Sequence, residues 1–566
     1  MRLSTDVERD GSLALETIAA ALEAGISVLD TAHAYGHGAG ELGHNERLVA
    51  AALRRAGAAS TARVVTKGGM SRPGGAWVAD GRAKAIRADC EASLEALGGV
   101  PIDLYLVHAP DPRTPWRTSV RALARLAEEG LVRHVGVSNV TRRQLDEALA
   151  LAPIAAVEVA LNPFDDRALR GGVLQRCADA GIGMIVHSPL GGPGRARRLG
   201  RLPGLAAVAD DVGATPAEVA LAWLLDLSPV VVAIPGARRP ESVRSSVRAA
   251  QLALDDRHRD ALAAALGRRA TPRPAPRRGR RDDAEVVLVM GIPGAGKSTI
   301  AKEHAARGYV RLNRDERGGT LRALAAALDG ELSGGACRVV LDNTYLTRAT
   351  RNEVLEVAGR HGVPTRCIWL DIPLDQAQAN IAGRLLERYG ALPEPDELKR
   401  LAKREPGVLA PTSQMRALRE LEPPSADEGF ASLEVVPFTR AAVTPNAGGA
   451  VFVAASALNR QGWEDAVAGR APAAPHLVLD WRPDGSPDDL APLADRLSAV
   501  VSGPVEQALC PHPGGPPSCW CRPPLPGLVL AFARARGVDP ARSAFVGTSA
   551  AHRTLATTLG ASFVEP

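Results

Sequence analysis

Four polar residues near the start of the chain have the side chains that a carbonyl reduction requires. They are Asp30 and Tyr35 in LDTAHAYG, Lys67 in VVTKGG and His108 in YLVHAP. A carbonyl group that accepts a hydride also needs a proton, and tyrosine can donate it if a nearby lysine ammonium lowers the tyrosine pKa. Asp30 would hold that lysine, and His108 would orient the carbonyl. The four residues together predict hydride chemistry on a small carbonyl substrate.

A second group of residues has the pattern of a phosphate-binding loop. GIPGAGKST matches G-x-x-x-x-G-K-[ST] and stands between a β-like run and a helical run, as that motif requires. Backbone N–H groups of such a loop hold phosphates at a helix N-terminus. The pattern predicts ATP with Mg²⁺, the lysine reaching the β- and γ-phosphates and the serine binding the metal. The predicted nucleotide-binding residues are Gly291, Gly294, Gly296, Lys297, Ser298 and Thr299, with Ser298 as the Mg²⁺ ligand.

Two further features would complete a phosphoryl-transfer site. Asp315, in GYVRLNRDERG, ends the next predicted strand, where an acceptor hydroxyl would meet the γ-phosphate and need a base. Arg384 and Arg388, in NIAGRLLERYG, lie four residues apart on one face of a predicted helix. We expect a lid that covers the charge of the transition state, although a solvated arginine face would have the same pattern.

Three cysteines and a histidine have the spacing of a metal site. Cys510-x-His512-x6-Cys519-x-Cys521 offers four ligands, which is enough to close a tetrahedral Zn²⁺ site with no open position. Unpaired cysteines are the simplest alternative, and a redox dithiol would leave the histidine without a role. The spacing favours a structural zinc.

The composition is that of a soluble protein with several domains. A chain of 566 residues is too long for one hydrophobic core. The formal charge of +5 neither requires nor excludes a polyanionic partner. We expect a cytoplasmic protein without a membrane partner, because the seven cysteines are few and the sequence shows no secretory signal and no long apolar run. The oligomeric state is not indicated.

Changes in composition divide the chain into three predicted domains. Residues 267–283, GRRATPRPAPRRGRRDD, have the arginine and proline content of an extended linker, and a basic nucleic-acid-binding arm is the alternative. The predicted domains are 1–266, 284–440 and 441–566. In the first, seven β-like runs alternate with helical stretches, which over about 260 residues favours a TIM (β/α)8 barrel over an open sheet. Both later domains are expected to be α/β.

The first domain resembles the aldo-keto reductases, on GISVLDTAHAYG, VVTKGG, DLYLVHAPD, GLVRHVGVSN, HSPL and IPGARRPESV. The resemblance implies that Tyr35 is the general acid and that Asp30, Lys67 and His108 complete its tetrad. Glu158 replaces the family's usual Gln beneath the nicotinamide, Ser246 replaces an Asn near the adenine, and an N-terminal hairpin is missing. The implied NADPH-binding residues are Ser138, Asn139, Glu158, Ser188, Leu190, Ile234, Gly236 and Arg238.

The second domain resembles the P-loop kinase domain of 5′-hydroxyl polynucleotide kinases. The resemblance rests on GIPGAGKST, GYVRLNRD, the long run from VVLDNTYLT to TRCIWL and the arginine helix. It implies that Asp315 is the general base, that Arg384 or Arg388 is the lid arginine, and that the acceptor is a 5′-OH end of RNA or DNA. A small-molecule kinase has the same core.

The third domain resembles the Rossmann-like haloacid dehalogenase-type phosphatases of the histidinol-phosphate and heptose-bisphosphate branch, which carry a zinc clip. That family needs an Asp at the end of its first strand and another two residues later. We take HLVLDWRPDGS as this strand, so that Arg482 replaces one carboxylate whether Asp480 or Asp484 supplies the other. Further losses are Pro523 for a lysine and Thr548 and His552 for metal-binding aspartates, whereas Ser502 matches its motif. The domain is predicted to be an inactive phosphatase whose zinc is structural.

These features predict an NADPH-dependent reductase fused to an ATP-dependent polynucleotide-type kinase and a degenerate phosphatase. Two alternatives remain. One is a kinase–reductase that acts on a small metabolite, and the other is a barrel that senses NADP(H) and regulates the kinase.

Overall fold

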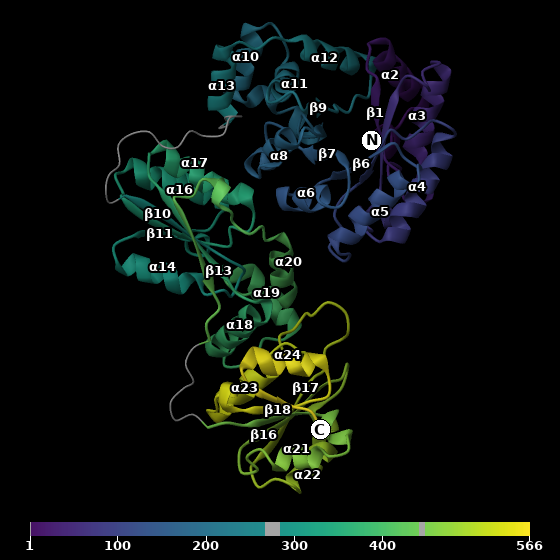
Figure 1. Cartoon of the computed structure of the whole chain (residues 1–566). Coiled ribbons are helices and arrows are strands. Elements are labelled where there is room, and N and C mark those ends of the chain that lie inside the picture. Colours follow the sequence, from purple (N-terminus) through teal and green to yellow (C-terminus); the bar gives the residue numbers. More distant parts are fainter. Residues whose placement is uncertain (1, 267–283, 441–447) are drawn as a thin grey trace. The chain divides into compact units, whose positions relative to one another are not determined.

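The structure is a computed structural model that describes residues 2–266, 284–440 and 448–566. The linker predicted at 267–283 lies outside the described residues. The chain forms two compact units, Met1–Pro274 and Ala275–Pro566, and each is described by itself (Figure 1). The predicted boundaries between three domains remain predictions.

The first unit is built on a parallel sheet of seven strands with the order β1-β2-β5-β6-β7-β8-β9. All seven apolar runs that the sequence marks as β-like are strands. Their bounds are Val28–Asp30, Arg63–Gly68, Leu104–Val107, His134–Ser138, Ile154–Ala160, Gly183–His187 and Val231–Ala233. A short antiparallel hairpin, β3 (Met70–Ser71) with β4 (Val78–Ala79), follows β2.

Helices cover the outer face of this sheet (Figure 1). The main ones are α2 (Gly11–Glu23), α3 (His44–Arg55), α4 (Ala83–Leu97), α5 (Trp116–Glu128), α6 (Arg142–Leu149), α8 (Val173–Ala180), α10 (Pro203–Asp211), α11 (Pro216–Asp226), α12 (Pro240–Gln251) and α13 (Asp256–Leu266). The shorter ones are α1 (Arg2–Thr5), α7 (Arg167–Arg170) and α9 (Pro193–Ala196).

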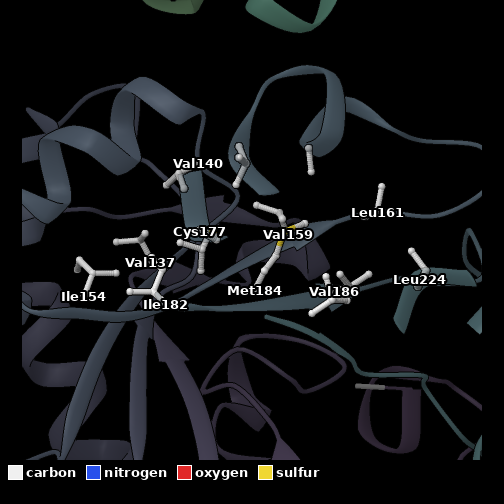
Figure 2. Close-up of a cluster of buried hydrophobic side chains, with 14 of the residues drawn as sticks. Val137, Val140, Ile154, Val159, Leu161, Cys177, Ile182, Met184, Val186 and Leu224 are labelled. Carbon is white, nitrogen blue, oxygen red and sulfur yellow. The ribbon is translucent and has the colours of Figure 1, made fainter. Parts of the chain in front are cut away.

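The strands are apolar on both faces because both faces are buried. In β5, Tyr105 and Val107 pack outward against the helices, whereas Leu104 and Leu106 belong to a small inner cluster with Ile185. Figure 2 shows part of the outer core, where side chains of β6, β7 and β8 meet the labelled residues of α8 and α11.

The prediction of a TIM (β/α)8 barrel is confirmed in part, because the fold is a TIM-barrel-like curled parallel sheet, but it has seven strands among the described residues. The sheet is curled, but β1 and β9 are its two edges, and no hydrogen-bonded pairing joins them among the residues that the structure describes. Closure of a barrel requires that pairing. Val28 of β1 and Val232 of β9 are accordingly exposed, at 38% and 45%. The sequence has seven β-like runs and seven strands form. The eighth strand of the predicted barrel rests on the length of the domain alone.

The second unit contains two parallel sheets. The first has the order β11-β12-β10-β13-β14 and carries helices on both faces. Its strands are β10 (Glu285–Met290), β11 (Val310–Leu312), β12 (Arg338–Asp342), β13 (Thr365–Asp371) and β14 (Ser432–Pro437). Its helices are α14 (Lys297–Ala306), α15 (Arg314–Arg317), α16 (Leu321–Ser333), α17 (Arg348–Arg360), α18 (Leu374–Tyr389), α19 (Pro395–Arg404) and α20 (Pro411–Glu420).

The second sheet of this unit has the order β17-β16-β15-β18-β19. Its strands are β15 (Val451–Ala454), β16 (His476–Trp481), β17 (Val505–Cys510), β18 (Ala544–Val546) and β19 (Ser562–Val564). Helices α21 (Trp463–Ala468), α22 (Ala491–Ser498), α23 (Gly527–Arg536) and α24 (Ala550–Leu559) cover it. The first strand is therefore β15, at the centre of the sheet, and not the run HLVLDWRPDGS, which forms β16.

The two sheets of the second unit are linked through helices α18 and α19. Trp520 is 1% exposed and packs in an apolar cluster with Ile381 and Leu385 of α18 and Leu398 of α19. Its indole Nε1 donates a hydrogen bond to the backbone oxygen of Leu409, at 3.0 Å. In the described parts of the chain, no helix is both long and apolar enough to span a membrane.

Candidate active sites

Lys67 is the centre of a buried cluster at the carboxyl ends of the strands in the first unit. The side chain is fully buried, and Nζ donates hydrogen bonds to Asp30 Oδ1 at 2.6 Å and to the backbone oxygen of Thr31 at 3.0 Å. Nζ also lies 3.1 Å from Glu158 Oε2 and 5.3 Å from the ring centroid of Tyr35. Strands β1, β2 and β7 supply the three charged groups, because parallel strands end at the same edge.

The cluster has two carboxylates for one ammonium group. Burial alone would lower the pKa of Lys67, but Asp30 and Glu158 outweigh it, so that the pKa is raised and the lysine stays charged. Burial and the neighbouring Asp30 raise the pKa of Glu158, which Lys67 only partly opposes. The pKa of Glu158 is thereby raised to about 8, so near neutral pH this side chain is mostly protonated and brings little charge to the cluster.

Tyr35 is 7% exposed and lies close to this cluster. Its pKa is raised, chiefly by burial, with Asp30 and Glu158 acting in the same direction and Lys67 opposing them. The expected lowering of the tyrosine pKa is therefore wrong as a net effect, although the lysine acts in the expected direction. A raised pKa keeps Tyr35 protonated at neutral pH, which a proton donor requires.

His108 follows β5 and stacks edge-to-face with Tyr35, at 5.6 Å between ring centroids. Burial, with a smaller contribution from the Lys67 charge, lowers the pKa of His108 to about 3, so the ring is neutral at physiological pH. Its Nδ1 is buried and has no hydrogen-bond partner among the described residues. The structure thus brings together the four predicted residues Asp30, Tyr35, Lys67 and His108.

Most of the predicted cofactor residues follow the ends of β6 to β9. Asn139 and Ser188 have left-handed backbone angles, with φ of 56° and 52°, and His187 Nε2 lies 3.0 Å from Asn139 Oδ1. Ser138 and Glu158 end or lie within β6 and β7, and Leu190, Ile234 and Gly236 follow β8 and β9. Arg238 is instead engaged with Asp6, at 3.3 Å.

The sequence analysis missed three residues beside this cluster. Trp77 packs against Tyr35 and His108, with ring centroids at 6.1 and 5.8 Å. Arg72 stacks on Trp77, and both belong to the β3–β4 hairpin segment, which is too short for a periodic pattern. His187 ends β8 within the quoted run HSPL, so its position at a strand end could have identified it.

The phosphate-binding motif of the second unit forms the predicted loop between β10 and α14. Gly291, Gly294 and Gly296 have φ of 148°, 88° and 93°, which side chains disfavour. A Cβ on Gly294 would lie 2.4 Å from the backbone oxygen of Ala377 on α18. Lys297 Nζ folds back to donate hydrogen bonds to the backbone oxygens of this loop, at 3.0 and 2.9 Å.

Lys297 has no carboxylate in direct contact. Burial lowers its pKa to about 8, an effect that Asp342 and Asp315 partly oppose and Arg384 reinforces. Ser298 and Thr299 follow Lys297 at the start of α14 and are exposed.

The two candidate lid arginines of α18 have different surroundings. Arg384 lies near enough to Lys297 to affect its pKa, and its Nη2 donates to the backbone oxygen of Gly407 at 2.6 Å. Arg388 is paired with Glu405. Asp315 is exposed on α15, where Asn313 accepts a hydrogen bond from its backbone N–H at 2.7 Å. The geometry therefore separates the two arginines and leaves Arg384 with the loop.

The four predicted zinc ligands lie together at the end of β17 and in the following loop. One ligand atom from each of Cys510, His512, Cys519 and Cys521 lies within 4.8 Å of all the others. Three of the separations are 3.4, 3.5 and 3.7 Å. A tetrahedron with zinc–sulfur bonds of about 2.3 Å has edges of roughly 3.8 Å, so the donors have the right spacing. The other ring nitrogen of His512 lies 2.8 Å from Glu394 Oε2, at the N-cap of α19.

The carboxylates expected for a phosphatase are not at the centre of the last sheet. The first strand, β15, ends with Ala454, and no acidic residue follows before residue 464. Asp480 is the second-to-last residue of the second strand, β16, and pairs with Arg482 at 2.9 Å. Ser502 precedes β17 and bonds the backbone oxygen of Pro472 at 3.3 Å. The prediction that HLVLDWRPDGS is the first strand is therefore wrong, since that run forms β16.

Comparison with known proteins finds two matching families. Residues 286–403 match the AAA domain family and indicate a P-loop, kinase-like nucleotide-binding domain. Residues 4–266 match the Aldo/keto reductase family. An uncharacterized oxidoreductase of Schizosaccharomyces pombe is 32% identical over 252 residues, which are 44% of this chain and 78% of that protein.

Two further relatives are aldo-keto reductases. The protein str7 of Strobilurus tenacellus is 30% identical over 266 residues, or 42% of this chain and 76% of its own. The crystal structure of a Klebsiella pneumoniae enzyme in complex with NADP and acetate is 26% identical, covers 45% of this chain and 85% of its own, and has a TM-score of 0.39. The two relatives that are at least 30% identical over three quarters of their length show that this chain belongs, through its first unit, to the aldo/keto reductase family.

Proposed function

We propose that the first unit is an NADPH-dependent carbonyl reductase. The observation that carries this proposal is the buried contact of Lys67 with Asp30 beside a protonated Tyr35 and a neutral His108. NADPH would supply the hydride. Tyr35 would donate its hydroxyl proton to the carbonyl oxygen, and the Lys67 ammonium would stabilise the phenolate that forms.

His108 and the aromatic side chains around it would orient the carbonyl. A neutral imidazole can donate one N–H to the carbonyl oxygen, and Nδ1 of His108 is buried without a partner among the described residues. Asn139, Ser188, Ile234 and Arg238 fit a cofactor because they follow the strand ends on the same edge of the sheet as Tyr35. The test is a panel of aldehydes and ketones with NADPH, followed by its absorbance. Binding of NADPH without turnover of any carbonyl would contradict the proposal.

We further propose that residues 284–440 are an ATP- and Mg²⁺-dependent kinase for a 5′-OH end of RNA or DNA. Lys297 and the loop amides would hold the phosphates of ATP, and Ser298 would bind the Mg²⁺. Asp315 would take the proton of the acceptor hydroxyl, and Arg384 would offset the negative charge of the transition state. The resemblance to polynucleotide kinases supports a 5′-OH end of RNA or DNA as the phosphate acceptor. Transfer of ³²P from ATP to 5′-OH oligonucleotides, with Lys297→Ala as control, tests it. Labelling of small alcohols alone would assign a small-molecule kinase instead.

We also propose a structural zinc at Cys510, His512, Cys519 and Cys521, in a domain that has lost phosphatase activity. The spacing of the donors supports the metal, and the absence of a carboxylate directly after β15 supports the loss of activity. Four protein ligands leave no position for a reacting water. Metal analysis should find one zinc per chain, and Cys519→Ser should lower the thermal stability. A zinc-free protein of unchanged stability would contradict this.

A second candidate role for the first unit is the sensing of NADP(H). It is favoured by Glu158, which together with burial and Asp30 raises the pKa of Tyr35 and so opposes proton donation. Kinase rates with NADP⁺, with NADPH and without either test this role, and equal rates would exclude it.

A further inference from the structure

Arg72 is a buried guanidinium group without a carboxylate partner. It lies between β3 and the turn Pro73–Gly75 and is 7% exposed. Its Nε and Nη1 atoms are buried, and neither has a hydrogen-bond partner among the described residues. An isolated buried charge is costly, and native proteins rarely keep one unless something binds it.

The carboxylates of the neighbouring segments are already used by other arginines. Asp80 pairs with Arg82 at 2.5 Å, Asp111 with Arg113 at 3.1 Å, and Glu41 with the more distant Arg9 at 2.6 Å. Arg72 thus remains available for a negative charge from outside the chain.

The position of Arg72 connects it with the proposed reductase site. Its guanidinium carbon lies 3.9 Å from the ring centroid of Trp77, and that centroid lies 6.1 Å from the centroid of Tyr35. The guanidinium is therefore within about 10 Å of the Tyr35 ring. Stacking on Trp77 fixes the plane of the guanidinium and compensates part of its charge.

Arg72 also lines a cavity of about 500 Å³ beside the loop that follows Tyr35. His37, Gly38 and Gly74 are other members of its wall, and none of the lining residues is acidic. The cavity has room for a small organic acid, and its one permanently charged group is a cation.

We propose that Arg72 binds the carboxylate of an acidic carbonyl substrate, such as an ω-aldehyde acid, while its carbonyl group lies at Tyr35. A single guanidinium carries the one positive charge that a carboxylate needs, whereas a phosphate dianion calls for more than one cation. This inference rests on the proposed reductase function. In the reaction, hydride goes from NADPH to the carbonyl carbon and the Tyr35 proton to the oxygen. The products are a hydroxy acid and NADP⁺, and the carboxylate is unchanged.

The test compares 4-oxobutanoate with its uncharged methyl ester. We expect kcat/KM to be roughly 10- to 100-fold higher for the acid, which is the range for a charge-assisted pair. Arg72→Gln should bring the acid-to-ester ratio of kcat/KM close to one, and Arg72→Lys should give an intermediate ratio. Arg82→Gln, on an exposed arginine paired with Asp80, is the matched control and should keep the wild-type ratio.

Three results would overturn the proposal. One is an equal kcat/KM for acid and ester in the wild type, which requires no variant to fold. Another is a weaker affinity of Arg72→Gln for NADPH with the acid-to-ester ratio retained, which would place Arg72 on a cofactor phosphate. The third is a preference for glyceraldehyde 3-phosphate over glyceraldehyde without a preference for the acid.

A binding experiment separates this inference from the proposed reduction. Calorimetry with 4-hydroxybutanoate, the product acid, needs no turnover. Binding to the wild type at least tenfold tighter than to Arg72→Gln would support the acid site even if no carbonyl were reduced. Equal or absent binding to both proteins would overturn it.

Discussion

The two candidate catalytic lysines have opposite electrostatic surroundings. Lys67 contacts Asp30 and lies near Glu158, and its pKa is raised. Among the described residues, Lys297 Nζ donates only to backbone oxygens of its own loop, and burial lowers its pKa to about 8. The chain itself neutralises the first lysine, which acts on a neighbouring tyrosine. The second is left for a ligand to neutralise, as expected of a residue that binds phosphates.

The largest expected difference between the lysines is in stability. Lys67→Met would leave two buried carboxylates without a counterion and should destabilise the first unit by about 3–5 kcal/mol. Lys297→Met should leave the stability of the second unit unchanged or raise it, because it removes a desolvated charge. Calorimetric unfolding of both variants measures this, with the exposed Lys84→Met as control. A Lys67→Met protein as stable as the control would show that the cluster is not a buried ion pair.

The two arginines of α18 should differ almost as much in kinase activity. Arg384→Ala should lower the phosphoryl-transfer rate about 10²- to 10³-fold, because it removes a cation next to the Lys297 loop. Arg388→Ala should change the rate by no more than about threefold, since it breaks only an exposed pair with Glu405. Single-turnover kinetics of both variants decide the matter. Equal losses of the phosphoryl-transfer rate in the two variants would show that Arg388 acts in the reaction as much as Arg384 does.

The affinity for ATP should depend on pH through Lys297. Its pKa of about 8 lies below the ordinary lysine value, and bound phosphate would raise it again. Above pH 8, binding therefore takes up a proton, and the affinity should fall by up to about tenfold per pH unit. Calorimetric titrations between pH 7 and 9.5 test this. Lys297→Arg, which stays charged, should lose the dependence, and a flat profile for the wild type would contradict the lowered pKa.

The smallest effect is expected at Glu158. Glu158→Gln removes one of the two carboxylates and should lower the pKa of Tyr35, so that reduction becomes about three- to tenfold faster. Steady-state rates over a pH series measure this. A slower variant would mean that the second carboxylate takes part in the reaction rather than opposing it.

Much of the first unit could be predicted from its apolar runs. The runs form parallel strands, and residues at their ends must meet at one edge, which is why Asp30, Lys67 and His108 could be grouped without a structure. The lack of a β1–β9 pairing among the described residues could not be predicted, since it depends on contacts between strands that are distant in the sequence. Arg72 and Trp77 lie on a short hairpin without a periodic pattern.

The last sheet shows where sequence reasoning failed. β15 has only four residues and ends in alanine, whereas β16 is longer and has an aspartate, Asp480, next to its last residue. The more acidic run, HLVLDWRPDGS, therefore has the composition expected of the first strand. The order of strands in a sheet, however, is decided by tertiary contacts. The meeting of Cys510, His512, Cys519 and Cys521 was easier to predict, because their spacing is local and four donors within twelve residues can come together in one loop.

The central claim is that Tyr35 donates the proton of a carbonyl reduction under the control of Lys67. The most direct measurement is kcat/KM for NADPH-dependent reduction by Tyr35→Phe beside Tyr105→Phe. Tyr105 is a fully buried tyrosine in the same sheet whose hydroxyl donates only to a backbone oxygen, at 3.2 Å. We predict a loss of about 10³-fold or more for Tyr35→Phe and less than about tenfold for Tyr105→Phe. Equal rates for the two variants would contradict the claim.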